Sequence, residues 1–281
     1  MASIDQLLEE HKLTHKKEEI IRRLSPAIGL GKVEIEEADI PVGASKFGGL
    51  PDLPPHLIFP QYEHGFLSFL AQMNLSEAKP FDSENLLPAR GMLYFFYDAV
   101  EQPWGMDQED EGCFRVLYYD GGLDALERTA YPEATEDYFP LPAFRMVFKA
   151  FRTLAEEGME GEWEEADAKK YDEFKDALTQ ADSIEGEEGY PEPMHYMFGD
   201  PYNIQDNVFE EISYYEHREK LAWDAPGIKA SVRNMVLLFQ MDSDDDLEVM
   251  WGDVGVLYFC MDRDDLLNKR FDRVKFILQC C

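Results

Sequence analysis

Four acidic residues alternate along the stretch DSDDDLEVMWGD (residues 242–253) and could supply oxygen ligands to a hard cation such as Ca²⁺. These residues are Asp242, Asp244, Asp246 and Glu248. An EF-hand loop requires glycine at its sixth position and glutamate at its twelfth, where this stretch has Leu247 and Asp253. We therefore expect a solvated acidic loop or, alternatively, an adventitious cation site, and predict no dedicated metal site.

The histidines and cysteines form no recognisable catalytic or metal-binding set. His11 and His15 have helical spacing, but no third ligand accompanies them, and His195 and His217 are expected to be packing or surface residues. Cys113 would be a nucleophile only beside a base that the sequence does not provide. The sequence has no serine-hydrolase, zinc-protease or nucleotide-binding motif. We predict no catalytic residue, no bound metal and no cofactor.

The stretch KFGGLPDLPP (residues 46–55) has the glycines of a phosphate-binding loop but also three prolines. Such a loop needs consecutive backbone N–H donors at the start of a helix, whereas prolines remove donors and no helix is expected to follow. Gly48 and Gly49 permit positive φ angles, and the prolines fix the chain that follows. We predict a stiff apolar corner that, with Phe47, could wall a groove.

Aromatic and β-branched runs bounded by Gly, Pro or Asp predict strands, and apolar residues at helical spacing predict helices. Strands are expected over residues 32–40, 65–75, 91–98, 113–120, 144–154, 235–242, 255–262 and 273–281. Helices are expected over residues 4–24, 162–182 and 207–223, with a helical turn over 264–271. In the first strand, Val33, Ile35 and Ile40 are candidate inward positions. The pattern predicts an α+β fold with antiparallel β-sheets and peripheral helices.

Two pairs of these stretches match each other in order, which predicts an internal duplication of a β-rich unit. LSFLAQMN (67–74) aligns with MVLLFQMD (235–242), and ARGMLYFFYD (89–98) aligns with DVGVLYFCMD (253–262). FGGLPD (47–52) and FGDPYN (198–203) match more loosely. Because side chains alternate along a strand, Leu93 and Phe95 should be core residues in the same surroundings as Leu257 and Phe259.

Gln72 and Gln240 occupy matching points in the middle of the repeated strands. A buried glutamine needs hydrogen-bond partners, so each either clamps the backbone of a neighbouring loop or contacts a ligand. Trp251 and Asp253 precede the second repeated strand, where we predict a packed turn in which Asp253 accepts backbone N–H bonds.

The charge is strongly negative, because 58 acidic residues against 26 Lys and Arg give −32. Nucleic acids and anionic membranes would be repelled, and a basic partner would be attracted, although solubility alone is the simpler alternative. No apolar run is long enough to span a membrane, and the N-terminal residues lack a signal-peptide pattern. With four cysteines lacking a disulfide pattern, a cytoplasmic protein is expected.

We expect residues 1–30 to form an N-terminal helix and residues 31–281 to form a single domain. Its two related halves would span about 31–155 and 190–281. Between them, residues 156–189 should form an acidic helical segment, since residues 156–188 hold fourteen acids and three bases.

Several blocks resemble, in order, the YwqG-like proteins, a bacterial family of unknown function related to the TYPP superfamily. The blocks are KFGGLPDLPP, FLAQMNL, LPARGMLYFFYD, MFGDPYNIQ, LLFQMDSDDD, WGDVGVLYF and DLLNKRFDRVKFILQ, within residues 45–281. Gln205 matches the end of the family's fourth block. The resemblance implies chaperone-like protein binding or neutralisation of a toxin as an immunity protein, and it transfers no catalytic residue.

The sequence therefore favours non-enzymatic binding of a basic protein or peptide, in a groove between the halves. Candidate groove residues are Phe47, Gly48, Gly49, Gln72, Gln205, Gln240, Trp251 and Asp253. The alternatives are an enzyme with a site between the halves near Gln72 and Gln240, and a structural scaffold that the duplication merely stabilises.

Overall fold

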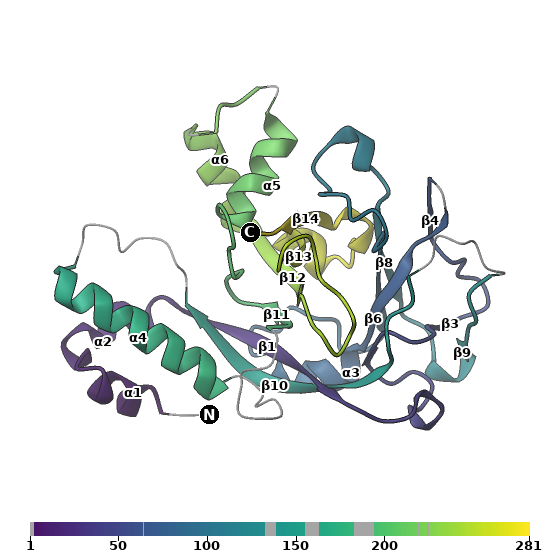
Figure 1. Cartoon of the computed structure of the whole chain (residues 1–281), viewed down its shortest axis with the longest axis horizontal. Helices are drawn as coiled ribbons and strands as arrows, with labels where there is room; N and C mark the ends of the chain where they lie inside the picture. The colour runs from purple at the N-terminus through teal and green to yellow at the C-terminus, as the bar shows by residue number, and fades with distance from the viewer. Residues whose placement is uncertain are drawn as a thin grey trace.

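The computed structural model describes residues 3–63, 65–132, 139–154, 163–182, 194–218, 220–223 and 225–281. Its largest element is a ten-stranded sheet in which every pairing is antiparallel (Figure 1). In spatial order its strands are β14 (Lys275–Gln279), β13 (Val256–Asp262), β12 (Met235–Asp242), β11 (Tyr196–Phe198), β1 (Leu24–Val33), β10 (Phe144–Leu154), β2 (Lys46–Phe47), β6 (Ser68–Asn74), β7 (Met92–Tyr97) and β8 (Phe114–Tyr119). The α+β class with antiparallel sheets is thus confirmed.

Two short two-stranded sheets and several helices surround this sheet. The small sheets pair β3 (Asp52–Leu53) with β9 (Glu127–Arg128) and β4 (Gln61–Tyr62) with β5 (Gly65–Phe66). The α-helices are α1 (Ile4–Glu10), α2 (Lys17–Ile21), α3 (Leu75–Ala78), α4 (Glu165–Asp182), α5 (Val208–His217), α6 (Pro226–Ser231) and α7 (Arg263–Leu267). Short 3-10 helices include η1 (Thr14–Lys16), η2 (Glu37–Asp39), η4 (Gln108–Asp110) and η8 (Phe271–Arg273).

The large sheet bends so that its two outer thirds face each other as walls, one made of β6–β8 and the other of β12–β14 (Figure 1). Aromatic side chains fill the space between the walls. The ring centroids of Phe95 and Phe239 are 4.8 Å apart, and those of Phe114 and Phe276 are 5.1 Å apart. The two walls therefore share one continuous apolar core.

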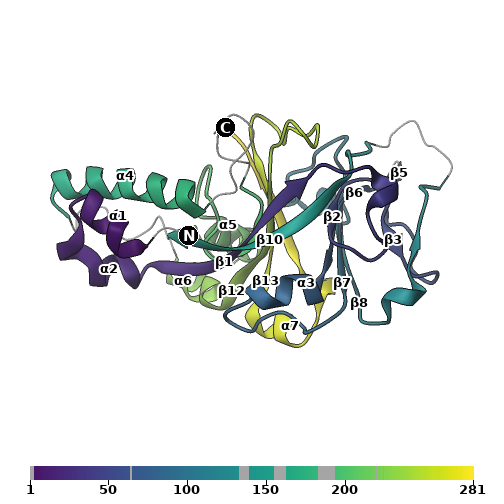
Figure 2. The ribbon, with the colours of Figure 1, turned by 90° about the horizontal axis from the view of Figure 1, so that it is seen from below.

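Strands β1 and β10 form a long ribbon that connects the walls and extends away from them (Figure 2). Helices α1, α2 and α4 gather at the far end of this ribbon and bury a second apolar cluster. That cluster contains Leu8, Leu13, Ile20, Phe174 and Leu178. The described part of the acidic segment, α4, therefore packs on the N-terminal helices, and the remainder of residues 156–189 lies outside the described residues.

The single helix expected over residues 4–24 is wrong. Helix α1 ends where Lys12 takes a positive φ of 57°, and β1 begins at Leu24. The strand expected over 32–40 is also wrong, since β1 ends at Val33, which is 42% exposed, and η2 follows. Residues 24–33 instead pair with β10 along their whole length, and this tertiary pairing outweighs the local patterns at the two ends of β1.

The matched stretches form hairpins with the same register. Gln72 pairs with Tyr94, as Gln240 pairs with Tyr258. Each hairpin is irregular at the same point, between Phe69 and Ala71 in one and between Leu237 and Phe239 in the other. The core prediction is confirmed, because Leu93, Phe95, Leu257 and Phe259 are all fully buried in the cluster between the walls.

The looser match between FGGLPD and FGDPYN is displaced by one residue in space. Lys46 pairs with Gln72 while Tyr196 pairs with Gln240, so Phe198 corresponds to Gly48 and not to Phe47. The φ angles agree with this correspondence, since they are 54° at Gly48 and 63° at Phe198. The two corners thus share a backbone conformation with positive φ at this position. The Phe-Gly residues that the two sequences have in common do not occupy equivalent positions in the structure.

We expect Phe95→Leu and Phe259→Leu each to lower the free energy of unfolding by about 1 to 3 kcal/mol. Because the two rings lie 5.2 Å apart, the double variant should show a coupling energy of about 0.5 to 1.5 kcal/mol in denaturant titrations. Phe174→Leu, in the separate helical cluster, is the control and should combine additively with Phe95→Leu. Additivity of the Phe95 and Phe259 variants would contradict a shared core.

Candidate functional site

The two repeated glutamines are clamps on loop backbones. The amide of Gln72 accepts the Asp52 N–H at 2.7 Å and donates to the Ala44 carbonyl at 2.8 Å. Gln240 likewise accepts the Tyr202 N–H at 3.1 Å and donates to the Met194 carbonyl at 3.0 Å. Both side chains are fully buried, so their polar atoms are satisfied within the fold.

A tyrosine completes each clamp. Tyr94 donates its hydroxyl proton to the Asp52 carbonyl at 2.7 Å, and Tyr258 donates to the Tyr202 carbonyl. Burial, reinforced by the charge of Asp52, raises the pKa of Tyr94, so this hydroxyl stays protonated as a donor. An enzyme site beside Gln72 and Gln240 loses its basis, because these groups already have partners and aromatic side chains fill the space between the walls.

Charged side chains reinforce the first clamp. Asp52 accepts from Gln72 at 2.7 Å and from Arg128 at 3.0 Å, both on the buried side of the loop. Lys46 is fully buried and donates to Glu37 at 3.0 Å. Burial lowers the pKa of Lys46, and the carboxylates of Asp52 and Glu37 oppose that shift. The network binds the KFGGLPDLPP corner to its neighbours and offers no free group to a ligand.

The KFGGLPDLPP stretch forms a corner in which Gly48 and Gly49 take the positive φ angles that glycine permits, 54° and 66°. Gly48 N–H donates to the Leu70 carbonyl and Gly49 N–H to the Leu141 carbonyl, each at 2.9 Å. Neither N–H is therefore available to cradle a phosphate. A methyl group at Gly48 would lie 2.1 Å from the Pro142 carbonyl oxygen. Phe47 is fully buried in the core, so it walls no groove.

The remaining three candidates lie in the second half and serve different purposes. Trp251 is fully buried and donates its indole N–H to the Asp242 carbonyl at 3.2 Å. Asp253 is exposed, and it is its backbone carbonyl that accepts a hydrogen bond, from Cys281. Gln205 is exposed and donates to the Cys280 carbonyl at 2.8 Å. The eight candidates thus do not line one groove.

The alternating acidic stretch forms ion pairs with a lysine of the same chain, Lys32. The ammonium of Lys32 lies 2.6 Å from Asp244 and 2.8 Å from Asp246. Asp244 is buried, so the expectation of a solvated loop is wrong for this residue and holds for Asp246, whose side chain is 61% exposed. Among the described residues, no group of three or more His, Cys, Asp or Glu side chains is arranged to hold a metal ion.

His195 closes this cluster on its inner side. Its Nε2 lies 2.8 Å from Asp244, and its Nδ1 accepts the Asp242 N–H at 3.1 Å. Both ring nitrogens are therefore occupied, which leaves no free nitrogen to activate a nucleophile. Burial alone would raise the pKa of Asp244, but the His195 hydrogen bond and the Lys32 charge outweigh it and lower that pKa to about 2.

A groove of about 490 Å³ lies on the surface of the described part of the chain, away from the residues that the sequence suggested. One wall is part of the connection between β7 and β8, and the other is formed by α5 and β14 (Figure 1). Residues of the first wall include Asp107, Asp110 and Glu111. The groove therefore lies between the β7–β8 connection and α5 with β14, and none of the eight residues expected from the sequence lines it.

We define the acidic loop as residues 98–112. It contains six acidic residues, and no Lys or Arg occurs between Arg90 and Arg115. Its exposed carboxylates are Glu101, Asp107, Glu109 and Glu111. This run of acidic residues is the feature of the sequence that indicates the acidic wall. The longer acidic run at residues 156–188, which includes α4, is more prominent in the sequence.

Hydrogen bonds to the second half hold the acidic loop in place. The Gln102 side chain donates to the Met250 carbonyl at 3.1 Å and accepts the Gly252 N–H at 2.8 Å. The Leu278 N–H donates to the Trp104 carbonyl at 3.0 Å, which also covers part of the outer edge of β14. These hydrogen bonds attach the acidic loop to the second half and hold its backbone beside the groove.

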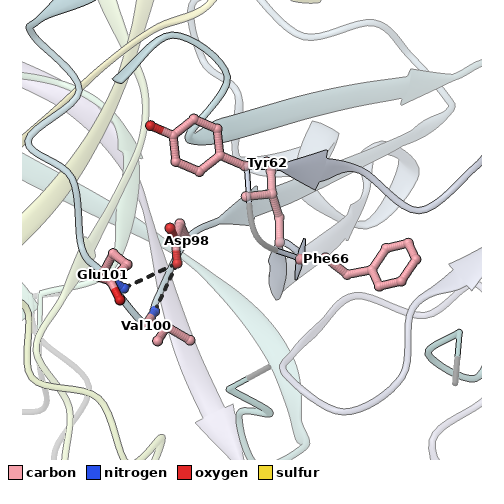
Figure 3. Close-up of a pocket in the computed structure, with 7 residues that line it drawn as sticks. Tyr62, Phe66, Asp98, Val100 and Glu101 are labelled. Atoms are coloured by element: carbon pink, nitrogen blue, oxygen red, sulfur yellow. Dashed lines mark hydrogen bonds between the residues drawn. The ribbon is translucent and has the colours of Figure 1, made fainter. Parts of the chain in front are cut away.

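A smaller hollow of about 100 Å³ lies at the start of the same loop and is lined by Tyr62, Phe66 and Asp98, among others (Figure 3). Asp98 accepts the N–H groups of Val100 at 3.1 Å and Glu101 at 3.2 Å, and this pair of bonds forms the turn (Figure 3). This carboxylate thus shapes the loop, and the larger groove is the better candidate for binding.

The fold and the site define an antiparallel α+β domain with a bent sheet, closed buried polar networks, and a surface groove in which an acidic wall faces a wall that carries basic residues. The chain belongs to the family described as Domain of unknown function (DUF1963), whose model matches residues 45–280. A search of curated proteins found no match. Among the residues described, no helix combines the length and apolar composition needed to cross a membrane.

Asp244→Asn should lower the free energy of unfolding at pH 7 by about 3 kcal/mol, because Lys32 loses its buried partner. The folded pKa of about 2 lies below the ordinary 3.8, so the stabilisation is fully present above about pH 4 and is lost as the pH falls toward 2. Urea titrations at several pH values should show the difference from the unsubstituted chain shrinking over that interval. Asp246→Asn is the exposed control, and an Asp244→Asn effect independent of pH would contradict this account.

The family match begins at residue 45, yet β1 lies between β10 and β11 in the centre of the sheet. A chain starting at residue 34 should therefore lose cooperative thermal unfolding, because β10 and β11 would lose their common partner. A chain starting at residue 23 removes α1 and α2 but keeps β1, and it should retain a cooperative transition of the sheet. If calorimetry shows the same cooperative transition for the chain starting at residue 34 as for the chain starting at residue 23, β1 is dispensable for the sheet.

Proposed function

We propose that this protein is a non-catalytic binding module for a basic protein or peptide. The observation that supports the proposal best is the groove between the halves, one wall of which is the acidic loop. A volume of about 490 Å³ leaves room for a few side chains of a partner. The overall charge of −32 would draw a basic partner toward the surface and repel nucleic acids and anionic membranes.

Exposed apolar side chains beside the carboxylates favour a protein partner over a simple counterion. Val100 and Trp104 belong to the acidic loop, and Trp104 is 48% exposed. Met250, on the turn that Gln102 binds, is also exposed. Aromatic and methionine side chains are enriched at protein interfaces, and surrounding charges supply orientation and specificity.

The finer assignment we propose is the YwqG-like branch that the sequence blocks resemble, in a bacterial cytoplasm. Chaperone-like holding and toxin neutralisation would both require capture of a basic protein, so the acidic loop serves either. We also propose that the halves, about residues 31–155 and 190–281, arose by duplication. The identical hairpin registers and the repeated Gln–Tyr clamps support this origin.

Two alternatives remain distinguishable by experiment. An enzyme would need a polar site elsewhere than beside Gln72 and Gln240, and a pure scaffold would bind nothing at the acidic loop. Salt-sensitive binding located at the loop separates the proposed function from both.

Binding of a fluorescent Lys/Arg-rich peptide should weaken on the order of tenfold when Asp107→Asn, Glu109→Gln and Glu111→Gln are combined, because three exposed charges are lost. The wild-type affinity should fall steeply between low and moderate salt, measured by fluorescence anisotropy. The matched control is Asp172→Asn, Glu173→Gln and Asp176→Asn on α4, which removes the same charge far from the groove.

An equal loss in the two triple variants would mean that only the overall charge matters. No binding of the basic peptide at low salt, with an acidic peptide of the same length as reference, would rule out the proposed function.

A further inference from the structure

One cation of the second half already occupies the acidic wall of the groove. Arg218, directly after α5, places Nη1 3.0 Å from an Asp107 carboxylate oxygen. The two residues are 111 positions apart, and their side chains are 39% and 65% exposed. The same guanidinium lies 5.1 Å from the ring centroid of Tyr215. Within the groove, the Arg218 guanidinium therefore contacts both a carboxylate, that of Asp107, and an aromatic ring, that of Tyr215.

We propose that the acidic loop and Tyr215 form a binding surface for an arginine of a basic partner, and that Arg218 occupies this surface in the free protein. The inference rests on the proposed function and specifies it further. The partner is an arginine-bearing protein segment, and Arg218 is an internal competitor that the segment displaces.

Charge pairing within the groove distinguishes Arg218 from Lys275, another base that lines it. Lys275 is bound on its own wall, 2.7 Å from Glu216 and 3.5 Å from Asp262. Arg218 instead reaches across to the opposite wall. The acidic wall therefore has an occupant supplied by the facing half.

The acidic wall is preorganised for this contact. Asp110 accepts the Gly105 N–H at 2.9 Å, and the Asp110 N–H donates to the Asp107 carbonyl at 3.0 Å. These bonds close η4 and fix the backbone that carries the Asp107 carboxylate. A fixed carboxylate recognises a partner at lower entropic cost than a mobile one.

The solvent exposure of the Arg218–Asp107 pair makes displacement feasible. Exposed ion pairs contribute little net stability, so a partner arginine with additional contacts can replace Arg218. An arginine suits the site better than a lysine, because the planar guanidinium can stack on Tyr215 while it donates to Asp107.

The test measures affinity of the full chain for a synthetic arginine-rich peptide and for its lysine counterpart of equal length and charge. Arg218→Ala should bind the arginine peptide about two- to fivefold more tightly than the wild type does, since the internal competitor is gone. Arg22→Ala, at the helical end of the ribbon, removes the same charge far from the groove and is the control. Tyr215→Ala should reduce the preference for arginine over lysine.

The outcomes separate the two proposals. If the arginine peptide binds and Arg218→Ala matches Arg22→Ala in affinity, the internal-competitor inference is overturned while the proposed function stands. If neither peptide binds any of these variants at low salt, the proposed function fails and the inference fails with it. A gain restricted to Arg218→Ala, with unchanged thermal unfolding, supports both.

Discussion

The shared core between the two walls is the interaction on which the rest of the structure depends. Rings from β7 and β12 meet at 4.8 Å, and rings from β8 and β14 meet at 5.1 Å, so neither wall can be solvated without exposing the other. Burial of this aromatic surface drives the bend of the sheet. The bend in turn brings the acidic loop of one half opposite α5 of the other and so creates the groove.

Buried polar groups in this core are tolerated because each has partners that the fold supplies. The Gln–Tyr clamps repeat in both halves, while the charged network around Lys46 lies within the first half and the pairing of Lys32 with Asp244 joins the first half to the second. Closed networks of this kind favour one backbone arrangement over its alternatives, since an unpartnered buried amide or ammonium is costly. The groups that looked most reactive in the sequence are for this reason structural.

Function is therefore best sought on the surface, where charges remain available. The acidic loop combines exposed carboxylates with exposed Val100 and Trp104 on a backbone held by the second half. Arg218 shows which chemistry this surface accepts.

The sequence by itself determined the α+β class, most strands, the core positions of Leu93, Phe95, Leu257 and Phe259, and the positive φ angles of Gly48 and Gly49. These features follow from local periodicity and from backbone preferences of glycine and proline, which neighbouring residues encode. Only the tertiary structure decided that residues 24–33 are a central strand, that Lys32 fills the acidic stretch, and that Arg218 faces Asp107. Each of these depends on pairing between residues more than 100 positions apart, which composition and spacing do not specify.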